Sequence, residues 1–294
     1  MKHHVKVAAI AAESRPGCTE ANLENIRRFS RRAAEQGADL VLFPELSVTG
    51  FLPNHPTGDH SQWLRDALTG AWAMAETLEG NAVRQLAAIS AETGVLLAAG
   101  LLENAGSTLY NTHVLAGEGR VYGYWRKMHI PMFEMQIYNG GGIPEVVETP
   151  LGRIGENICF DALLPESTRL LGVQGCEIAL FPFAADPPPA TPEAWAGWAG
   201  PVLRARCAEN GLFGIACNYS GRVSYAGAEQ TFPGGAMVVG PDGALIAGVA
   251  SQMLLADLTA QGLLDARSAF EYTFRFRRPE LYQSLAIGAH LIRN

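Results

Sequence analysis

A cysteine with the surroundings of a nucleophile lies near the middle of the chain, in the sequence LGRIGENICFDALLPE of residues 151–166. An apolar, β-branched run predicts a strand that ends at Cys159, and Pro165 with Glu166 opens a helix soon afterwards. In α/β folds, ligands bind and nucleophiles are displayed at the carboxyl ends of strands. The N–H groups at a helix start give a nearby thiol thiolate character if a base or a cation is close, and that partner has to come from a distant segment. A lone cysteine is more often a small, buried core residue, and this alternative stays open at this point.

An acid and an amine follow two other predicted strands in the same way. Residues 39–43 (DLVLF) form an apolar strand, and Glu45 comes just after it, where burial raises the pKa of a carboxyl group towards a value useful for a general base. Lys127 follows the predicted strand at residues 121–125; a partly desolvated lysine stabilises an anionic intermediate or, when neutral, acts as a nucleophile. Glu134 is a possible counterion for this lysine. Taken singly, the first glutamate would more often be an ordinary loop acid and the lysine a surface side chain.

Together, the three segments indicate acyl transfer. Each delivers a reactive side chain at the carboxyl end of an apolar strand, and such ends converge when the strands are neighbours in one sheet. A thiol, a carboxylate and an ammonium at one place supply a nucleophile, a proton acceptor and a cation that stabilises an oxyanion.

The elements that must position these side chains alternate along the chain. A strand at 5–12, a helix at 21–37 capped by Thr19 and closed by Gly37, and the strand at 39–43 form a right-handed crossover unit, which predicts parallel pairing. The other predicted helices are residues 79–93, 165–175 and 192–211, the last with a break or a fresh first turn at Pro201. The other predicted strands are residues 95–102, 110–116, 121–125, 177–181, 212–217, 235–240, 244–250 and 253–257.

A long, aromatic-bearing connection is predicted at residues 50–78. A segment of this length inside a compact domain is more typical of a functional lid than of a passive loop. Its histidines, His55 and His60, lie in a stretch rich in proline and glycine without helical spacing, so solvated loop histidines are favoured over metal ligands.

The composition describes a globular protein and excludes several functions. Of the 294 residues, 48% are hydrophobic and 17% charged, which excludes disorder for most of the length. The net charge of -7 argues against a nucleic-acid or anionic-membrane surface. Five cysteines without Cys-x-x-Cys spacing indicate neither a disulfide framework nor a zinc site, and they fit a reducing cytoplasm. The apolar run at the amino end is too short for a signal peptide, and no transmembrane span is predicted.

The three reactive segments, in their order and spacing, resemble the catalytic motifs of the nitrilase superfamily of carbon–nitrogen hydrolases. FPELSVTGF surrounds Glu45, YWRKMHIP surrounds Lys127, and GENICFDALLPE surrounds Cys159. The similarity extends to Glu134 ahead of a glycine-rich turn and to the later segments LRARCAENGLF, FPGGAMVVGPDG and RRPELY, so it covers nearly the whole chain.

This resemblance implies an α/β fold, a four-layer αββα sandwich, and a covalent mechanism that needs no metal or organic cofactor. Glu45 would be the general base, and Cys159 would attack the carbonyl or nitrile carbon to form a thioester-type intermediate after loss of ammonia or an amine. Lys127 and the backbone N–H of Phe160 would hold the oxyanion, and Glu134 would position the lysine and the substrate nitrogen.

The residues after the cysteine favour an amide as substrate. Phe-Asp at this place resembles the amidase and carbamoylase branches, whereas nitrilases usually carry Trp-Glu. Relatives that hydrolyse N-carbamoyl amino acids clamp the substrate carboxylate with arginines just after the cysteine motif; residues 162–164 are apolar here. The prediction is therefore a small, neutral or apolar linear amide, with N-carbamoyl amines or amino acids and then nitriles as alternatives. The candidate pocket residues, for which aromatic packing of long loops is an equal alternative, are Phe51, His55, Trp63, Phe183, Ala184 and Trp195.

Two other classes of function remain open. A catalytically silent binding protein on this fold would not need all four reactive residues, and an acyltransferase would pass the same thioester to an amine instead of water. We expect a cytoplasmic enzyme that binds a small amide, binds neither nucleic acid nor a membrane, and forms a homodimer or larger homo-oligomer. Residues 1–294 are predicted to be a single carbon–nitrogen hydrolase domain, with residues 270–294 as a basic and aromatic tail that packs on a neighbouring subunit.

Overall fold

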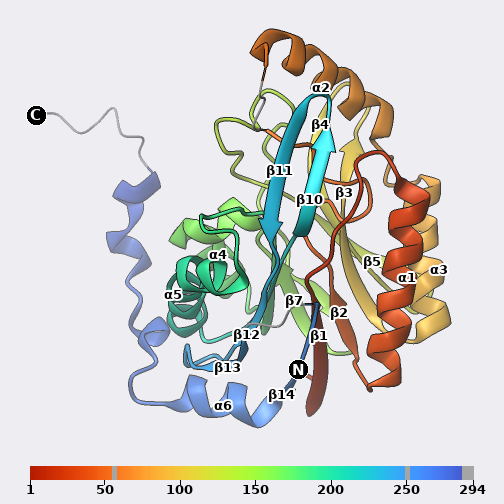
Figure 1. The fold of residues 1–294 in the computed structure, drawn as a ribbon. Helices are drawn as coiled ribbons and strands as arrows, with labels where there is room; N and C mark the ends of the chain where they lie inside the picture. Colours follow the sequence, from red (N-terminus) through yellow and green to blue (C-terminus); the bar gives the residue numbers. More distant parts are fainter. Residues whose placement is uncertain (55–57, 249–251, 287–294) are drawn as a thin grey trace, which may run out of the picture.

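Two six-stranded sheets form the centre of the molecule (Figure 1). The computed structural model describes residues 1–54, 58–248 and 252–286. In spatial order, the first sheet contains β14 (Met253–Thr259), β1 (His4–Ile10), β2 (Leu40–Leu42), β3 (Leu96–Asn104), β4 (Leu109–Gly117) and β5 (Arg120–Arg126). The second contains β13 (Leu245–Gly248), β12 (Ala236–Val239), β9 (Phe213–Asn218), β8 (Ile178–Phe183), β7 (Gly152–Glu156) and β6 (Val147–Thr149). The parallel pairing predicted for the first crossover unit is confirmed by β1 and β2, and β7, β8 and β9 are parallel as well.

The sheets pack face to face through alternating apolar side chains. In β1, Val5, Val7 and Ala9 belong to the core shared by the two sheets, whereas Ala8 and Ile10 belong to the core under the helices. Successive side chains of a strand point to opposite faces, so a strand that is buried on both faces is apolar at every position. This is why most of the central strands appear in the sequence as hydrophobic runs; in β1 the half-buried Lys6 interrupts the run.

Helices cover the outer face of each sheet (Figure 1). Helices α1 (Thr19–Glu35) and α3 (Asn81–Thr93) pack on the first sheet, and α4 (Pro165–Val173) and α5 (Pro192–Asn210) cover the second. The buried face of α1 has the spacing of an amphipathic helix, with Leu23, Ile26 and Phe29 under 4% exposed. The order helix, sheet, sheet, helix confirms the predicted four-layer αββα sandwich. None of the described helices combines the length and apolar character needed to cross a membrane.

The prediction that residues 50–78 form a long connection is wrong in part, because helix α2 (His60–Met74) lies within this range. Asp59 caps this helix by accepting hydrogen bonds from the backbone N–H groups of Ser61 and Gln62 at 2.8 and 3.2 Å. His60 is its first residue, and His55 lies outside the described residues.

A β-hairpin that was not predicted from the sequence packs against α2. It consists of β10 (Ser220–Tyr225) and β11 (Ala228–Pro233), which pair antiparallel around a turn at Ala226. The helix and the hairpin share one apolar cluster, which includes Trp63 and Phe232.

Several predicted boundaries also differ from the structure. Thr19 is the first residue of α1 rather than its cap, and α5 continues through Pro201. Strand β7 ends at Glu156, and Cys159 opens a short 3₁₀-helix, η1 (Cys159–Leu163). The predicted strand at 244–250 is described only as far as Gly248.

The carboxyl-terminal part continues the chain beyond the sheets. Helix α6 (Ala260–Ser268), which was not predicted from the sequence, is followed by the 3₁₀-helices η2 (Thr273–Phe276), η3 (Pro279–Leu281) and η4 (Gln283–Ala286). Several apolar side chains of this tail are largely exposed, among them Phe270 at 86% and Phe276 at 66%. Packing of the tail on a second subunit stays a prediction.

Candidate active site

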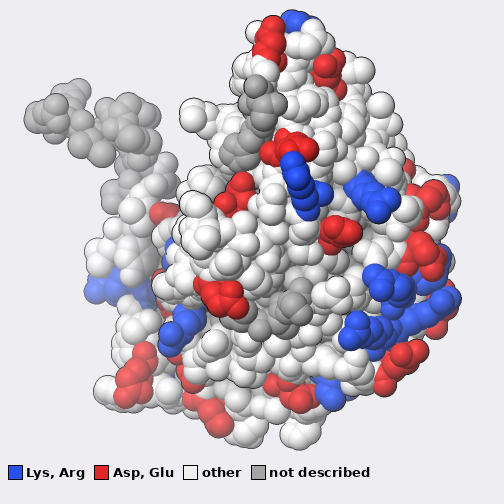
Figure 2. Space-filling model, in the orientation of Figure 1, with Lys and Arg blue, Asp and Glu red and all other residues white. Residues whose placement is uncertain are grey.

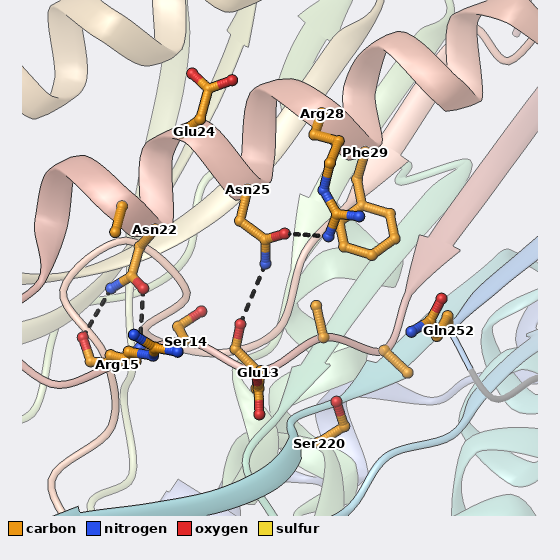
Figure 3. Close-up of a pocket in the computed structure, with 13 residues that line it drawn as sticks. Glu13, Ser14, Arg15, Asn22, Glu24, Asn25, Arg28, Phe29, Ser220 and Gln252 are labelled. Carbon is orange, nitrogen blue, oxygen red and sulfur yellow. Dashed lines mark hydrogen bonds between the residues drawn. The ribbon is translucent and has the colours of Figure 1, made fainter.

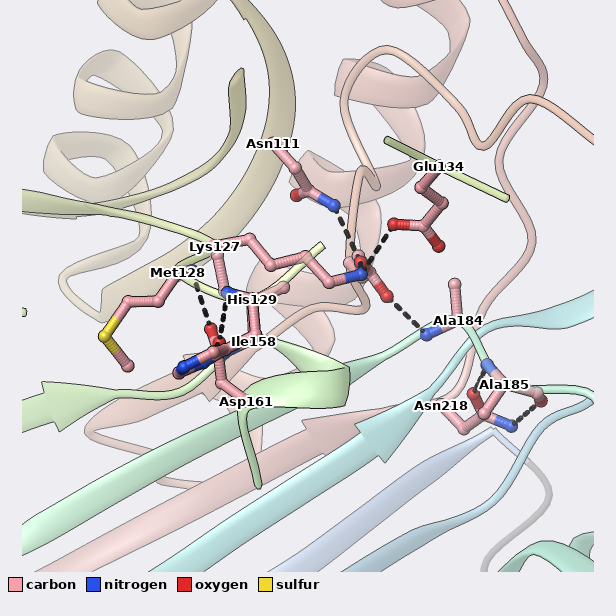
Figure 4. A network of polar contacts seen from close by, with 11 residues as sticks. Asn111, Lys127, Met128, His129, Glu134, Ile158, Asp161, Ala184, Ala185 and Asn218 are labelled. Atoms are coloured by element: carbon pink, nitrogen blue, oxygen red, sulfur yellow. Dashed lines mark hydrogen bonds and ion pairs between the residues drawn. The ribbon is translucent and has the colours of Figure 1, made fainter. Parts of the chain in front are cut away.

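The predicted acid, amine and second acid are in direct contact, and Figure 4 shows the ammonium of Lys127 beside the carboxylate of Glu134. The Nζ atom of Lys127 lies 2.7 Å from Oε1 of Glu45 and 2.8 Å from Oε2 of Glu134. All three side chains are buried, with residue exposures of 0%, 0% and 4%. Glu45 follows β2 and Lys127 follows β5, both in the first sheet, whereas Cys159 follows β7 of the second. The prediction that all three strands belong to a single sheet is therefore wrong: the reactive side chains converge from two facing sheets.

Three donors fix the carboxylate of Glu45. Besides Lys127, the side-chain amide of Asn111 donates to Oε1 at 2.7 Å, and the backbone N–H of Ala184 donates to Oε2 at 2.9 Å. Asn111 comes from β4, and Ala184 comes just after β8, so these contacts also join the two sheets. Asn111 was not predicted as a site residue; its one signal in the sequence is the polar run Asn111–His113 within a strand that is otherwise largely apolar.

Cys159 has an unusual backbone conformation. Its φ of +49° lies in the left-handed region, which a residue with a side chain rarely adopts. Leu46, directly after Glu45, has a φ of +52°. Two such residues beside the reactive groups are typical of sites where the surrounding structure imposes a strained geometry.

The carboxylate of Asp161 joins the turn around Cys159 to the segment after β5 that carries Lys127 (Figure 4). Its Oδ1 accepts the backbone N–H of His129 at 2.8 Å, and its Oδ2 accepts the backbone N–H of Met128 at 3.1 Å. Oδ2 also accepts the N–H of Ile158 at 3.3 Å. The His129 ring binds the same carboxylate, and this hydrogen bond raises the pKa of the imidazole. Asp161 was not predicted from the sequence as a residue of the site.

Burial and charge set the protonation of the reactive groups. Burial lowers the pKa of the Lys127 ammonium, but Glu134 and Glu45 outweigh this effect and raise the pKa well above its usual value. Burial also raises the pKa of Glu134 to about 7, against the opposing charge of Lys127. Burial, followed by the charge of Glu45, raises the pKa of the Cys159 thiol well above its usual value. The thiolate character expected for the cysteine is therefore not found in the resting site, and the thiol needs a base in order to react.

A cavity of about 480 Å³ opens onto Cys159. Its walls include aromatic, aliphatic and proline side chains, namely Pro131, Phe133, Phe160, Leu163, Pro187, Pro188 and Trp198. Its polar lining consists of Asn54, Glu134, Asp186 and Gln230. Within the described part of the chain, no arginine or lysine lines it.

The predicted pocket residues have different places. Ala184 lines the cavity. Phe51 and Trp63 are 1% and 4% exposed and lie in the cluster under the hairpin. Phe183 and Trp195 pack edge to face at 5.7 Å in the core behind the cavity. These four side chains therefore support the walls and do not line the cavity, which contradicts their prediction as pocket residues.

The predicted oxyanion donor is at the cavity. Phe160 is 36% exposed and contributes to its wall. Among the described residues, none accepts a hydrogen bond from the Phe160 backbone N–H.

A wider cavity of about 650 Å³ lies elsewhere, between α1 and the chain that follows β1 (Figure 3). Its polar groups bind one another. Asn22 donates to the carbonyl of Arg15 at 2.9 Å and accepts its N–H at 2.8 Å, and Asn25 donates to the carbonyl of Glu13 at 3.3 Å. None of the reactive residues lines this cavity. In the part of the chain that the structure describes, no three His, Cys, Asp or Glu side chains form a group that could hold a metal ion.

The two-sheet sandwich brings a thiol, two carboxylates and an ammonium to one buried site, and these groups can supply a nucleophile, a proton acceptor and a cation that stabilises an oxyanion. The chain belongs to the carbon–nitrogen hydrolase family, whose model matches residues 6–262. The predicted membership of the nitrilase superfamily is thereby confirmed.

Relatives and structural neighbours include both nitrilases and amidases. A bifunctional nitrilase/nitrile hydratase of Lupinus angustifolius is 27% identical over 92% of this chain and 82% of its own length. An amidase of Nesterenkonia sp. superposes with a TM-score of 0.74 at 26% identity and covers 97% of both chains. A carbon–nitrogen hydrolase of Helicobacter pylori G27 superposes with a TM-score of 0.79 at 22% identity, over 97% of this chain and 99% of its own. The class of reaction, hydrolysis of a carbon–nitrogen bond, follows from the family.

Proposed function

We propose that this protein hydrolyses small, uncharged amides with an apolar acyl group, through a thioester on Cys159. The observation that carries the proposal is the position of the thiol at an apolar cavity, beside the hydrogen-bonded set of Glu45, Lys127 and Glu134. A catalytically silent protein would have no need for a buried ammonium shared by two buried carboxylates, because burying such charges is costly.

The first half of the reaction forms the thioester. Glu45 removes the proton of the Cys159 thiol as sulfur attacks the amide carbon, and the carbonyl π electrons move to oxygen. The Lys127 ammonium and the Phe160 N–H stabilise this oxyanion. When the oxyanion collapses, the carbon–nitrogen bond breaks, and the protonated Glu45 gives its proton to the leaving nitrogen, which departs as ammonia or an amine.

The second half of the reaction releases the acid. Glu45, ionised again, takes a proton from water as the water oxygen attacks the thioester carbon. The new oxyanion collapses, the carbon–sulfur bond breaks, and the thiol regains its proton. Glu134 keeps the ammonium of Lys127 directed at the reacting oxygen throughout.

The cavity favours an uncharged, apolar acyl group over an anionic one. A substrate carboxylate needs a cationic partner, best supplied by the two-pronged guanidinium of arginine. Among the described residues that line the cavity, none is an arginine or a lysine that could supply this partner. Phe133, Phe160 and Trp198 instead offer aromatic faces to an apolar group.

Relatives support an amide without excluding a nitrile as a second substrate class. In a solved variant of the Nesterenkonia amidase, 25% identical to this chain, the acetamide moiety of fluoroacetamide is covalently added at the active-site cysteine. Curated relatives include nitrilases and bifunctional nitrilase/nitrile hydratases at 25–29% identity. Because a nitrile carbon is also attacked by a thiol, nitriles form the second arm of the test.

A substrate panel tests the proposal. Phenylacetamide and isobutyramide, the matching nitriles, and N-carbamoylphenylalanine are incubated with the wild-type enzyme and with Cys159→Ala, and ammonia release is measured. We expect turnover of the neutral amides, little turnover of the carbamoyl acid, and none by the variant. Turnover confined to nitriles or to the carbamoyl acid would contradict the proposed substrate, and turnover by Cys159→Ala would contradict the mechanism.

A further inference from the structure

A buried histidine and a buried glutamate join the two sheets beneath the candidate active site. His113 of β4 and Glu156 of β7 have fully buried side chains, and Nδ1 of the imidazole lies 3.1 Å from Oε1 of the carboxylate. No described residue makes a well-aligned hydrogen bond to either oxygen of this carboxylate, so the imidazole is its ionisable partner at contact distance. The proposed reaction steps use neither residue.

The pair forms a layer between the apolar core and the reactive side chains. Leu115, His113 and Asn111 follow one another on the same face of β4, because alternate residues of a strand share a face. Leu115 belongs to the apolar core between the sheets, whereas Asn111 donates to the carboxylate of the proposed general base. On the facing strand β7, Ile154 belongs to the same core and Glu156 is the next residue on that face.

The second nitrogen of the imidazole faces the backbone that carries the proposed base. Nε2 of His113 lies 3.4 Å from the carbonyl oxygen of Pro44, the residue before Glu45. Gly100 of β3 permits this packing, because a Cβ there would come within 2.7 Å of the His113 ring and 2.4 Å of the backbone nitrogen of Leu46. The His113 ring and the turn that carries Glu45 therefore both pack closely against β3.

The protonation of the buried pair determines which atom donates in the contact between Nε2 of His113 and the carbonyl of Pro44. A carboxylate and an imidazole sealed from water avoid an uncompensated charge by holding one proton between them. If that proton is on the imidazole, both ring nitrogens carry hydrogen; if it is on the carboxyl group, the carboxyl donates to Nδ1 and the ring keeps its hydrogen on Nε2. In both arrangements Nε2–H donates to the carbonyl of Pro44.

We propose that His113 and Glu156 are a pair of positioning residues that sets the separation between the base and the nucleophile. The histidine anchors the turn that carries Glu45, and the glutamate anchors the strand end that leads, three residues later, to Cys159. The proposal rests on the proposed function, since it assigns the pair to the same base and nucleophile.

Two substitutions of the histidine separate positioning from packing. The amide nitrogen of glutamine in His113→Gln takes the place of Nε2 and can still donate to Pro44, whereas that of asparagine in His113→Asn takes the place of Nδ1 and cannot. We expect kcat of the asparagine variant to be about tenfold or more below that of the glutamine variant, with similar KM, because small displacements of reacting groups cost up to about a hundredfold. Equal kcat values would overturn the proposal.

A second pair of variants separates positioning from stability. Glu156→Gln keeps the shape of the side chain and can donate to Nδ1, so its kcat should stay within about threefold of wild type. The double variant His113→Phe/Glu156→Leu replaces the pair by apolar groups, which often leaves stability unchanged or improved. We expect this variant to keep the Tm of the wild type and to lose kcat about tenfold to a hundredfold; wild-type kcat in the double variant would overturn the proposal.

Alkylation distinguishes failure of this inference from failure of the proposed function. The rate at which iodoacetamide modifies Cys159 is measured in each variant in a Cys18→Ser background, because Cys18 is the exposed cysteine. Base-assisted attack by the thiol needs the same geometry as hydrolysis, so His113→Asn should be alkylated more slowly than His113→Gln. If the wild type hydrolyses none of the amides, the proposed function fails, and the ratio of alkylation rates still decides the role of the pair.

Discussion

Cys159 has surroundings that oppose its ionisation. Burial and the neighbouring Glu45 raise the pKa of the thiol, while Lys127 lowers it without compensating. A protonated thiol is a weak nucleophile, so in the proposed mechanism the transfer of its proton to Glu45 accompanies the attack on substrate. The resting site thus avoids a free thiolate, which would be open to oxidation and non-specific alkylation.

Asp161 provides the first test at the scale of single residues. In Asp161→Asn, an amide replaces one of two oxygens that together accept N–H groups from Met128, His129 and Ile158. We expect a loss of about 1–3 kcal/mol in the free energy of unfolding, because at least one buried N–H loses its acceptor, together with a lower kcat. Denaturant unfolding and steady-state kinetics measure the two effects. The control is Asp66→Asn on the exposed face of α2. If Asp161→Asn loses no more stability than this control, the role of Asp161 as an acceptor of the three backbone N–H groups is contradicted.

Glu134 provides a test that depends on pH. Its pKa is raised from 4.5 to about 7 in the folded protein, so folding favours its protonated form. The contribution of this group to stability is full below pH 4.5 and is lost as the pH rises to about 7. The free energy of unfolding of the wild type should therefore fall relative to that of Glu134→Gln, by on the order of 3 kcal/mol over this interval. Parallel stability curves for the two proteins between pH 4 and pH 8 would show that the carboxyl is not buried as described.

At the scale of elements, the sequence predicts what local pattern determines. Unbroken apolar runs identify the central strands, and the 3.6-residue spacing identifies α1 and α3, because both patterns reflect which faces are buried. Helix α2 and the hairpin of β10 and β11 cannot be recognised in this way, because their apolar faces pack in one cluster with side chains from distant segments, among them Leu102 and Tyr138. Asn111 and Asp161 are missed for a similar reason: their roles depend on contacts with residues more than thirty positions away.

The packing of α2 on the hairpin is tested by two glycines in helices. A Cβ at Gly70 would lie 2.0 Å from the Tyr225 hydroxyl, whereas a Cβ at Gly197 of α5 meets nothing within 4 Å. Gly197→Ala should raise the free energy of unfolding by about 0.5–1 kcal/mol, since alanine has the higher helix propensity. Gly70→Ala should raise the free energy of unfolding by less than this, or lower it, because the side chain of Tyr225 must move. Equal gains from the two substitutions would mean that the hairpin does not pack on α2 in solution.

At the scale of the whole molecule, the charged side chains on the face shown in Figure 2 are mixed in sign. Two of the basic residues of α1 have acidic partners: Arg27 pairs with Glu24 and Glu92, and Arg31 also pairs with Glu92. Paired and interspersed charges leave little field for attracting a polyanion to this helix. The predictions that the protein binds neither nucleic acid nor a membrane and acts in the cytoplasm remain to be tested.

The exposed tail leads to a prediction about assembly. Phe270, Phe276, Leu281 and Leu285 are each more than 60% exposed, which is unusual for so many large apolar side chains in one short segment. We expect light scattering to give a mass of at least two chains, and truncation after Ser268 to lower the number of chains per particle. A monomeric full-length chain would contradict the predicted homo-oligomer, and an unchanged number of chains per particle after truncation would exclude the tail as the contact.

A covalent intermediate on Cys159 is the step on which the proposed function depends, and rapid-quench mass spectrometry of the intact protein during turnover of phenylacetamide tests it most directly. We expect a transient species heavier than the enzyme by the acyl group, located by peptide mapping on Cys159 and removed by hydroxylamine. Steady turnover with no acylated species, even when quenching outpaces turnover, or an acyl group on any other residue, would contradict the covalent mechanism.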